Sequence, residues 1–262
     1  MSVHNGAPWV SEAIGSLVRQ TMPDFELIVV DDGSTDTTPD LLGAVSDPRV
    51  RVERQEWRGL TPSLNRALGL SRAPLLARMD ADDVAVPERF EKQMAFLDAH
   101  PEVGLLGTGC QEIAPSGEIL GTVRPPVDDG AIRRALIRRN PFVHSSVMLR
   151  RAVLEQVDGY DEQLDVAQDY DLWLRMGRVT RLANLPDPLV LRRLAPGRVS
   201  SVRDSARLRA EVRIKLRALR SGAYPAWCAV FLAKPLLALT LPGVARRFLR
   251  RAMSREASRG VS

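Results

Sequence analysis

The hydrophobic residues of the chain recur with two periods, and these periods predict alternating helices and strands. Near the N-terminus, Val10, Ile14 and Leu17 follow the spacing of one helical face, which predicts a helix that ends near residue 20. The next apolar run, 25–30, is almost continuous, as is usual for parallel strands buried on both faces. The same criteria predict further helices over 38–45, 61–70, 87–99, 128–139, 150–157 and 168–176, and strands over 50–52, 75–79, 103–108, 144–149, 181–185 and 189–194.

Carboxylates follow two of these predicted strands. Asp31 and Asp32 come directly after the run 25–30, and Asp80-Ala81-Asp82-Asp83 comes directly after the run 75–79. Alternating strands and helices predict an α/β fold, and open α/β sheets bind ligands where their strands end. The acidic residues therefore mark a candidate ligand site.

The cluster Asp80, Asp82 and Asp83 places three negative charges within four residues. Neighbouring carboxylates repel one another, and a divalent cation with hard oxygen ligands relieves that repulsion. Mg²⁺ or Mn²⁺ fits this description best and leaves coordination positions for the phosphates of a substrate. A solvated acidic loop that caps the helix beginning near Pro87 is the alternative interpretation.

The character of the chain changes after residue 200, which predicts domains over 1–200 and 201–262. Residues 208–219 form an apolar helical stripe among arginines, and 226–241 is strongly apolar but interrupted by Lys234-Pro235. That segment is short for a membrane span, which needs about 20 apolar residues. It forms either a helical pair packed on its own domain or a partner, or an interfacial segment that touches an anionic membrane surface.

Composition and charge narrow the function classes. The 262 residues carry a net charge of +5 and include only the lysines Lys92, Lys215 and Lys234. Arginine suits phosphate or carboxylate recognition, yet the basic stretches lack interleaved aromatics, which argues against nucleic acid. Cys110 and Cys228 are too few for a disulfide framework, and the N-terminus lacks the apolar core of a signal peptide. We therefore expect a cytoplasmic protein, with peripheral attachment to the inner face of the membrane as a further possibility.

The order of the motifs resembles glycosyltransferase family 2, the inverting nucleotide-sugar enzymes with a GT-A fold. The similarity covers residues 2–200. A single acidic triplet is weak evidence, but several motifs in the family's order make coincidence improbable. The matching segments are 3–6, 24–36, Asn65, Asp80-Ala81-Asp82-Asp83 with Pro87 and Arg89, 144–148, 159–161 and 169–175.

This resemblance implies roles for individual residues near the donor. Ser2, His4 and Asp32 would bind the donor nucleotide, with Asp32 at the base, although Asp31 and Asp32 could simply cap the next helix. Asp80 would face the ribose and the metal, and Asp82 would bind the Mg²⁺ or Mn²⁺ joined to the diphosphate. Asp83 would support the turn.

The catalytic base implied by the resemblance is Asp169, which we expect to be ionised at a helix N-terminus. A first-turn acid without a catalytic task is the alternative. Asp171 should face away from the site, and Trp173 is expected in the core more than under a sugar. His144 either reaches the diphosphate or acceptor, or is satisfied within the core.

The resemblance implies an inverting, metal-dependent, hexosyltransferase-like enzyme. It would move a sugar from a UDP- or dTDP-sugar to a hydroxyl of a glycan or lipid-linked acceptor in cell-envelope or exopolysaccharide synthesis. A degenerate nucleotide-sugar-binding or scaffold protein and a sugar-1-phosphate nucleotidyltransferase are the alternatives. The chain departs from the family at Gln168, where many relatives have Glu, and at Leu194-Ala195, where a His often precedes Pro-Gly. Relatives also begin with a longer first strand, so we expect that central strand to be truncated at Met1.

Overall fold

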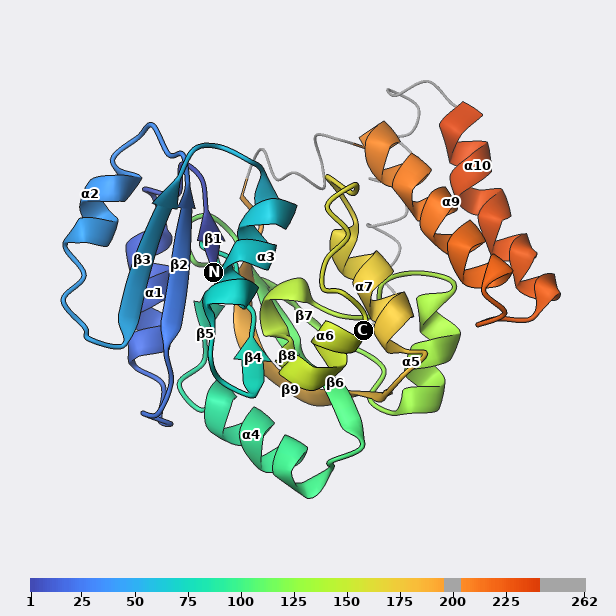
Figure 1. Ribbon diagram of the computed structural model, residues 1–262, viewed down its shortest axis with the longest axis horizontal. Helices are drawn as coiled ribbons and strands as arrows, with labels where there is room; N and C mark the ends of the chain where they lie inside the picture. Colours follow the sequence, from blue (N-terminus) through green and yellow to red (C-terminus); the bar gives the residue numbers. More distant parts are fainter. Residues whose placement is uncertain (196–203, 241–262) are drawn as a thin grey trace. The chain divides into compact units, whose positions relative to one another are not determined.

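Strand β2 (Leu27–Asp32) shows why its run of apolar residues is continuous. The computed structural model, which describes residues 1–195 and 204–240, places β2 between the parallel strands β1 (Ser2–Val3) and β3 (Val50–Gln55) (Figure 1). Leu27 and Val29 pack against α1 (Val10–Val18) and α2 (Thr38–Gly43), whereas Ile28 and Val30 pack against α3 (Leu60–Leu70). Helices on both faces thus require apolar residues at positions 27–30 of β2.

A second, mixed sheet follows along the chain, in the order β4-β8-β6-β9-β5, with β7 paired to β6. Parallel pairing joins β6 to β9, and the other pairs in this sheet are antiparallel. The strands and helices of this region are β4 (Leu75–Ala77), β5 (Val84–Ala85), α4 (Arg89–Ala99), β6 (Val103–Ile113), β7 (Ile119–Val123), α5 (Asp129–Leu136), β8 (Met148–Arg150), α6 (Arg151–Gln156), α7 (Gln168–Met176) and β9 (Arg181–Arg193).

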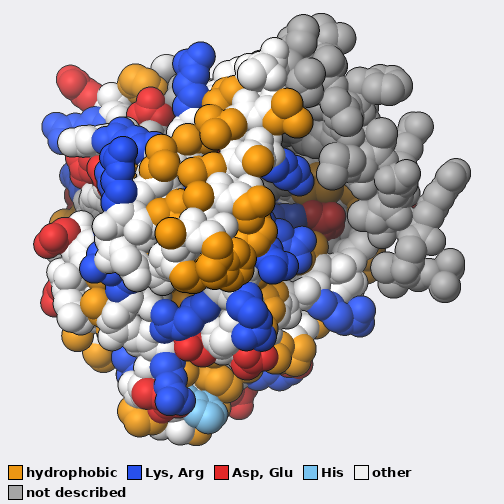
Figure 2. Space-filling view, turned by 90° about the vertical axis from the view of Figure 1, so that its right-hand side faces the viewer, with side chains coloured by type: hydrophobic (Ala, Val, Ile, Leu, Met, Phe, Trp, Pro, Cys, Tyr) orange, Lys and Arg blue, Asp and Glu red, His pale blue; other side chains and the backbone are white. Residues whose placement is uncertain are grey.

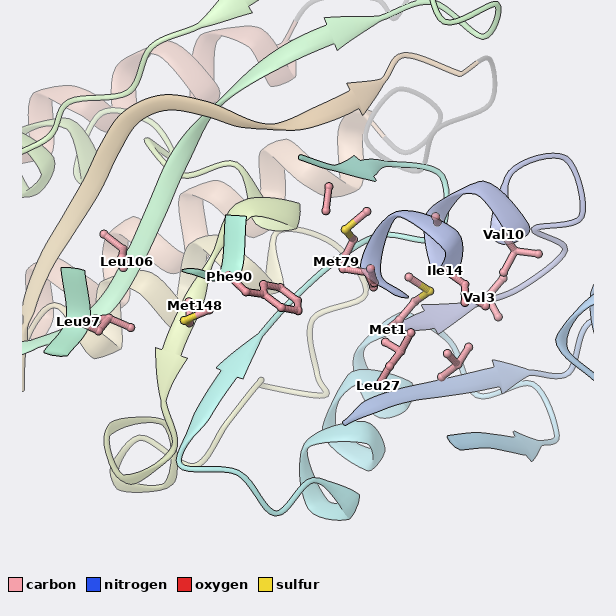
Figure 3. Packing of buried hydrophobic residues seen from close by; sticks show 14 of the residues in the cluster. Met1, Val3, Val10, Ile14, Leu27, Met79, Phe90, Leu97, Leu106 and Met148 are labelled. Carbon is pink, nitrogen blue, oxygen red and sulfur yellow. The ribbon is translucent and has the colours of Figure 1, made fainter. Parts of the chain in front are cut away.

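One hydrophobic cluster connects the two sheets. Met1, Val3 and Ile14 from the first part of the fold meet Met79 and Phe90 of the second, as Figure 3 shows. Burying apolar surface contributes roughly 25 cal/mol per Å², so this shared cluster holds the sheets together. The acidic segment that begins at residue 80 directly follows Met79, which is buried in this cluster and so fixes the position where the segment starts.

The structure corrects three expectations about the strands. Residues His144–Ser146 form a short 3-10 helix, η1, and only Met148–Arg150 is strand. The predicted strands 181–185 and 189–194 are one strand, β9, whose pairing with β6 shifts register near Gly109. The first strand is not central in its sheet, because β2 occupies the middle of the order β1-β2-β3.

The chain divides into two compact units, Met1–Pro196 and Gly197–Ser262. In the second unit, α9 (Asp204–Arg220), the 3-10 helix η2 (Ala226–Leu232) and α10 (Ala233–Thr240) pack against one another. Among residues 204–240 and 1–195, no helix has the length and apolar character needed to cross a membrane. The predicted basic end of this domain, around Arg246 to Arg251, lies outside the described residues.

Candidate active site

The carboxylate of Asp32 organises the end of β2. It is 2 % exposed and accepts hydrogen bonds from the side-chain amide of Gln55 at 2.7 Å and from the backbone N–H groups of Arg58 and Gly59, both at 2.8 Å. Asp32 therefore joins the ends of β2 and β3 to the start of α3. A carboxylate offers about four lone-pair positions, so these bonds leave acceptor capacity for a ligand N–H.

Residues after β1 lie against the same strand end. His4 shares a hydrogen bond between Nδ1 and the main-chain oxygen of Asp32 at 2.8 Å. Asn5, at φ +53°, accepts from the N–H of Thr35 at 2.9 Å and donates its own N–H to Ser34. Ser2 is half-buried in β1 and pairs with Val30. Ser2, His4 and Asp32 are thus brought to one edge of the sheet.

The three acids of the cluster Asp80, Asp82 and Asp83 also lie close together. One carboxylate oxygen from each of Asp80, Asp82 and Asp83 lies within 4.8 Å of the others. Ser145, on η1, donates to Asp80 at 2.7 Å and also contacts the carboxyl of Asp83. Gly6, after β1, lies next to Ala81, so the cluster adjoins the edge that carries Ser2 and His4.

Neighbouring charges give Asp80 and Asp83 opposite pKa shifts. Burial raises the pKa of Asp80, but the buried guanidinium of Arg78, which pairs with it, outweighs burial and holds that pKa below its ordinary value. Burial and the charges of Asp80 and Asp82 raise the pKa of Asp83 to about 7. A protonated Asp83 can donate to Ser145, which then donates to Asp80. Arg78 and Ser145 are functional candidates that the sequence had not indicated.

Arg193, at the end of β9, fixes the backbone of the acidic segment. Its main-chain N–H donates to the carboxylate of Asp83 at 2.8 Å, and its side-chain Nε donates to the main-chain oxygen of Asp82 at 3.0 Å. The same guanidinium pairs with Glu12 on α1 at 2.6 Å and donates to the main-chain oxygen of Pro115 at 3.1 Å. Both oxygens of Asp83 are thus engaged by the protein, as expected for a residue that supports the turn.

Asp169 lies at the start of α7, directly after Ala167 and Gln168. Its carboxylate accepts from the side-chain amide of Asn140 at 2.7 Å and from the N–H of Tyr170 at 2.8 Å. Burial raises the pKa of Asp169, whereas the hydrogen bonds and Arg78 oppose that rise. Burial, the largest of these effects, makes the carboxylate more basic than an exposed one.

The acidic cluster and Asp169 share one electrostatic environment. The charges of Arg78 and Asp80 both act on the pKa of Asp169. Tyr160 belongs to the same environment. Burial raises the pKa of its hydroxyl, and the charges of Arg78, Asp169 and Asp80 also act on that pKa. Its hydroxyl lies 2.8 Å from Nε2 of His144. Burial and Arg78 lower the pKa of His144, so the imidazole is neutral near pH 7.

Two other predictions about α7 are confirmed. Asp171 is buried and pairs with Arg175 on the same helix at 2.7 Å, so it faces away from Asp169. Arg175 also holds the preceding turn by donating to the main-chain oxygen of Gly159 at 2.7 Å. Trp173 is fully buried and contacts Phe142 and His144, which makes it a core residue.

This mixed α/β architecture, with acids at the end of β2 and after β4, is the GT-A fold, as similarity to solved structures shows. Residues 1–349 of the Staphylococcus aureus protein TarS, in complex with UDP-GlcNAc, match with a TM-score of 0.72 and 21 % identity, covering 90 % of this chain and 70 % of that fragment. A mannosyltransferase from Pyrobaculum calidifontis, in complex with GDP-Man and Mn²⁺, matches with a TM-score of 0.66 and 21 % identity, covering 98 % and 78 % of the two chains.

Sequence comparison identifies the family. The family model described as Glycosyl transferase family 2 matches residues 1–157. The amylovoran biosynthesis glycosyltransferase AmsE of Erwinia amylovora is 32 % identical over 223 residues, which cover 81 % of this chain and 82 % of AmsE. The chain therefore belongs to glycosyltransferase family 2 and is a glycosyltransferase.

Proposed function

We propose that this glycosyltransferase transfers a hexose with inversion from a nucleotide-diphosphate sugar to a hydroxyl acceptor. The observation that carries the proposal is the position of Asp169, a carboxylate with a raised pKa that shares the electrostatic environment of the acidic cluster. A base on the acceptor side and an anion-binding cluster on the donor side are the two parts that a direct displacement needs.

We assign the nucleotide of the sugar donor to the edge formed by β1 and β2. Asp32 would accept an N–H of the base, and Ser2, His4 and Asp80 would complete the nucleotide site. The TarS and mannosyltransferase complexes contain UDP-GlcNAc and GDP-Man, which supports a nucleotide sugar in general. We favour a UDP- or dTDP-sugar, because an ionised carboxylate suits the N–H of uracil or thymine.

The donor set of the acidic cluster fits a divalent cation with hard oxygen ligands. Asp80 and Asp82 would hold Mg²⁺ or Mn²⁺, since Ser145 and Arg193 already engage both oxygens of Asp83. Such a cation supplies positive charge near the diphosphate that leaves. Arg78 supplies a permanent cation on the protein side, because its guanidinium already pairs with Asp80.

Asp169 would act on the acceptor. Its carboxylate would take the proton from the acceptor hydroxyl while that oxygen forms a bond to the anomeric carbon. The bond between this carbon and the diphosphate oxygen breaks, and its electron pair leaves with the nucleoside diphosphate. Asn140 holds the carboxylate in place through its 2.7 Å hydrogen bond. One displacement at the anomeric carbon inverts its configuration.

The biological destination is proposed by similarity to relatives. AmsE is named for amylovoran biosynthesis, and WbnJ of Escherichia coli, 32 % identical over 179 residues, is named for O-antigen biosynthesis. We propose that residues 1–200 catalyse transfer to a cell-envelope glycan or lipid-linked acceptor at the inner face of the membrane. The extension over 201–262 would then serve attachment.

A thermal-shift screen of nucleotide sugars with and without Mn²⁺ tests the donor site. One donor should stabilise the protein only with the metal, and Asp82→Ala should abolish that response. Asp98→Ala, which removes an exposed acid from α4, is the matched control and should leave the response intact. Binding at 100 times Kd would stabilise the fold by about 2.7 kcal/mol. A folded protein that responds to no nucleotide would instead be a scaffold of the same fold.

A further inference from the structure

The second unit exposes large apolar side chains on η2 and α10. Trp227 is 67 % exposed, Leu237 is 68 %, Val230 is 61 % and Leu236 is 47 %. We call these four residues the apolar face. Figure 2 shows a face of the molecule on which hydrophobic side chains gather. A contiguous exposed apolar area of this kind usually marks an interaction surface.

The packing of α9, η2 and α10 against one another does not need the apolar face. Other apolar residues of the same elements, Cys228, Leu232 and Pro235, are buried, as are Leu208 and Ile214 of α9. Since a 3-10 helix repeats every three residues, Trp227 and Val230 project from the same side of η2. The sequence thus places one apolar set inside the unit and a second set on its surface.

Charge distinguishes this part of the chain from the rest. Residues 196–262 contain fifteen Lys and Arg against three Asp and Glu, whereas 1–195 contain 22 against 29. On α9, Arg209, Arg213, Arg217 and Arg220 are exposed and recur at helical spacing. The first unit is therefore acidic, and the unit with the apolar face is strongly basic.

We infer that the apolar face docks on the surface of an anionic lipid bilayer, with Trp227 and Leu237 entering the interface and the basic residues facing lipid phosphates. Apolar and basic side chains together match the two layers that such a surface presents. A symmetric contact between two copies through the apolar face would place two strongly basic units against each other, which is unfavourable. The inference rests on the proposed function only in naming the membrane as the place of the acceptor.

Vesicle flotation of the full chain, without donor or metal, tests this surface. Vesicles of phosphatidylcholine with phosphatidylglycerol should bind the protein, vesicles of phosphatidylcholine alone should bind it much less, and added salt should weaken binding. The double variant Trp227→Gln/Leu237→Gln should bind about tenfold or more weakly. The matched control Trp57→Gln/Ile119→Gln, which removes side chains 63 % and 58 % exposed on the first unit, should bind normally.

A second measurement locates the contact. Lipids brominated in their acyl chains should quench tryptophan fluorescence, and Trp227→Phe should remove that quenching. Equal vesicle binding by the two double variants would overturn the inference. A loss of thermal stability or of self-association in Trp227→Gln/Leu237→Gln, with vesicle binding unchanged, would also overturn it and would assign the face to the chain itself or to a second copy. Donor binding, measured without vesicles, is tested separately.

Discussion

Replacing Asn140 by Ala should change the pH dependence of sugar transfer through Asp169. The amide of Asn140 donates to Asp169 at 2.7 Å, and its own oxygen accepts from the N–H of Phe142 at 3.1 Å. That second bond fixes the orientation of the amide, so its NH₂ group faces the carboxylate. Asn140 thus stabilises the ionised form of the proposed base and is a positioning residue.

The sign and size of the effect follow from this contact. A hydrogen bond to the charged form of an acid lowers its pKa, and its loss in Asn140→Ala adds to the rise that burial already causes at Asp169. A hydrogen bond to a charged group contributes about 1.5–3 kcal/mol, which corresponds to about 1–2 pH units. Because the base acts when deprotonated, the acidic limb of kcat should move to higher pH by this amount.

The assay is a pH profile of kcat at saturating donor, acceptor and metal. Asn140→Asp should move the limb further than Asn140→Ala, because a second carboxylate would disfavour ionisation of Asp169. The control Asn184→Ala removes another buried amide, which donates to the main-chain oxygen of Pro126 at 2.8 Å, and it should leave the limb in place. An unshifted limb in Asn140→Ala, with kcat lowered equally at all pH values, would refute the positioning role.

Three further substitutions separate catalysis from folding. Asp169→Asn should keep the donor-dependent thermal shift while kcat falls by about 10²–10⁴; loss of both would mark a structural residue. Trp173→Ala should lower the free energy of unfolding by about 3–5 kcal/mol in urea titrations, and a cost below that of an exposed tryptophan would contradict its place in the core. Arg193→Met should weaken Mn²⁺-dependent donor binding, because the main-chain oxygen of Asp82 loses the hydrogen bond from the guanidinium, whereas unchanged affinity would limit Arg193 to a role in folding.

The sequence predicted the elements whose pattern is set by local burial. In β2, residues 27–30 alternate between helices on the two faces of the sheet, and the apolar residues of α1 all face one side. Both elements could therefore be predicted from their periodicity. The prediction of a strand over His144–Ser146 was wrong because these residues also occur in turns. In the structure their side chains serve tertiary contacts, with Ser145 bound to Asp80 and the hydroxyl of Ser146 accepting from the N–H of Thr108 at 3.0 Å.

The sequence indicated only those candidate site residues that stand in its motifs, namely the acids together with Ser2 and His4. The supporting residues of the site come from distant segments: Asn140 lies 29 positions from Asp169, Ser145 lies 62 from Asp83, and Arg193 lies 110 from Asp83. An Asn, a Ser or an Arg carries no local signal of such a contact, because only the folded chain brings the partners together. Arg193 in particular stands in a run of arginines that offers no means of choosing it.

The acidic cluster illustrates why the fold is needed to assign roles to equivalent side chains. In sequence, Asp80, Asp82 and Asp83 differ only in position, yet their neighbours divide them. Arg78 keeps Asp80 ionised, whereas burial beside two acids raises the pKa of Asp83 to about 7 and favours its protonated form below that pH. A protonated Asp83 removes one of three mutually repelling charges, and this lets the segment fold before a cation binds. Asp80, which keeps its charge, and the neighbouring Asp82 are then the acids suited to bind that cation.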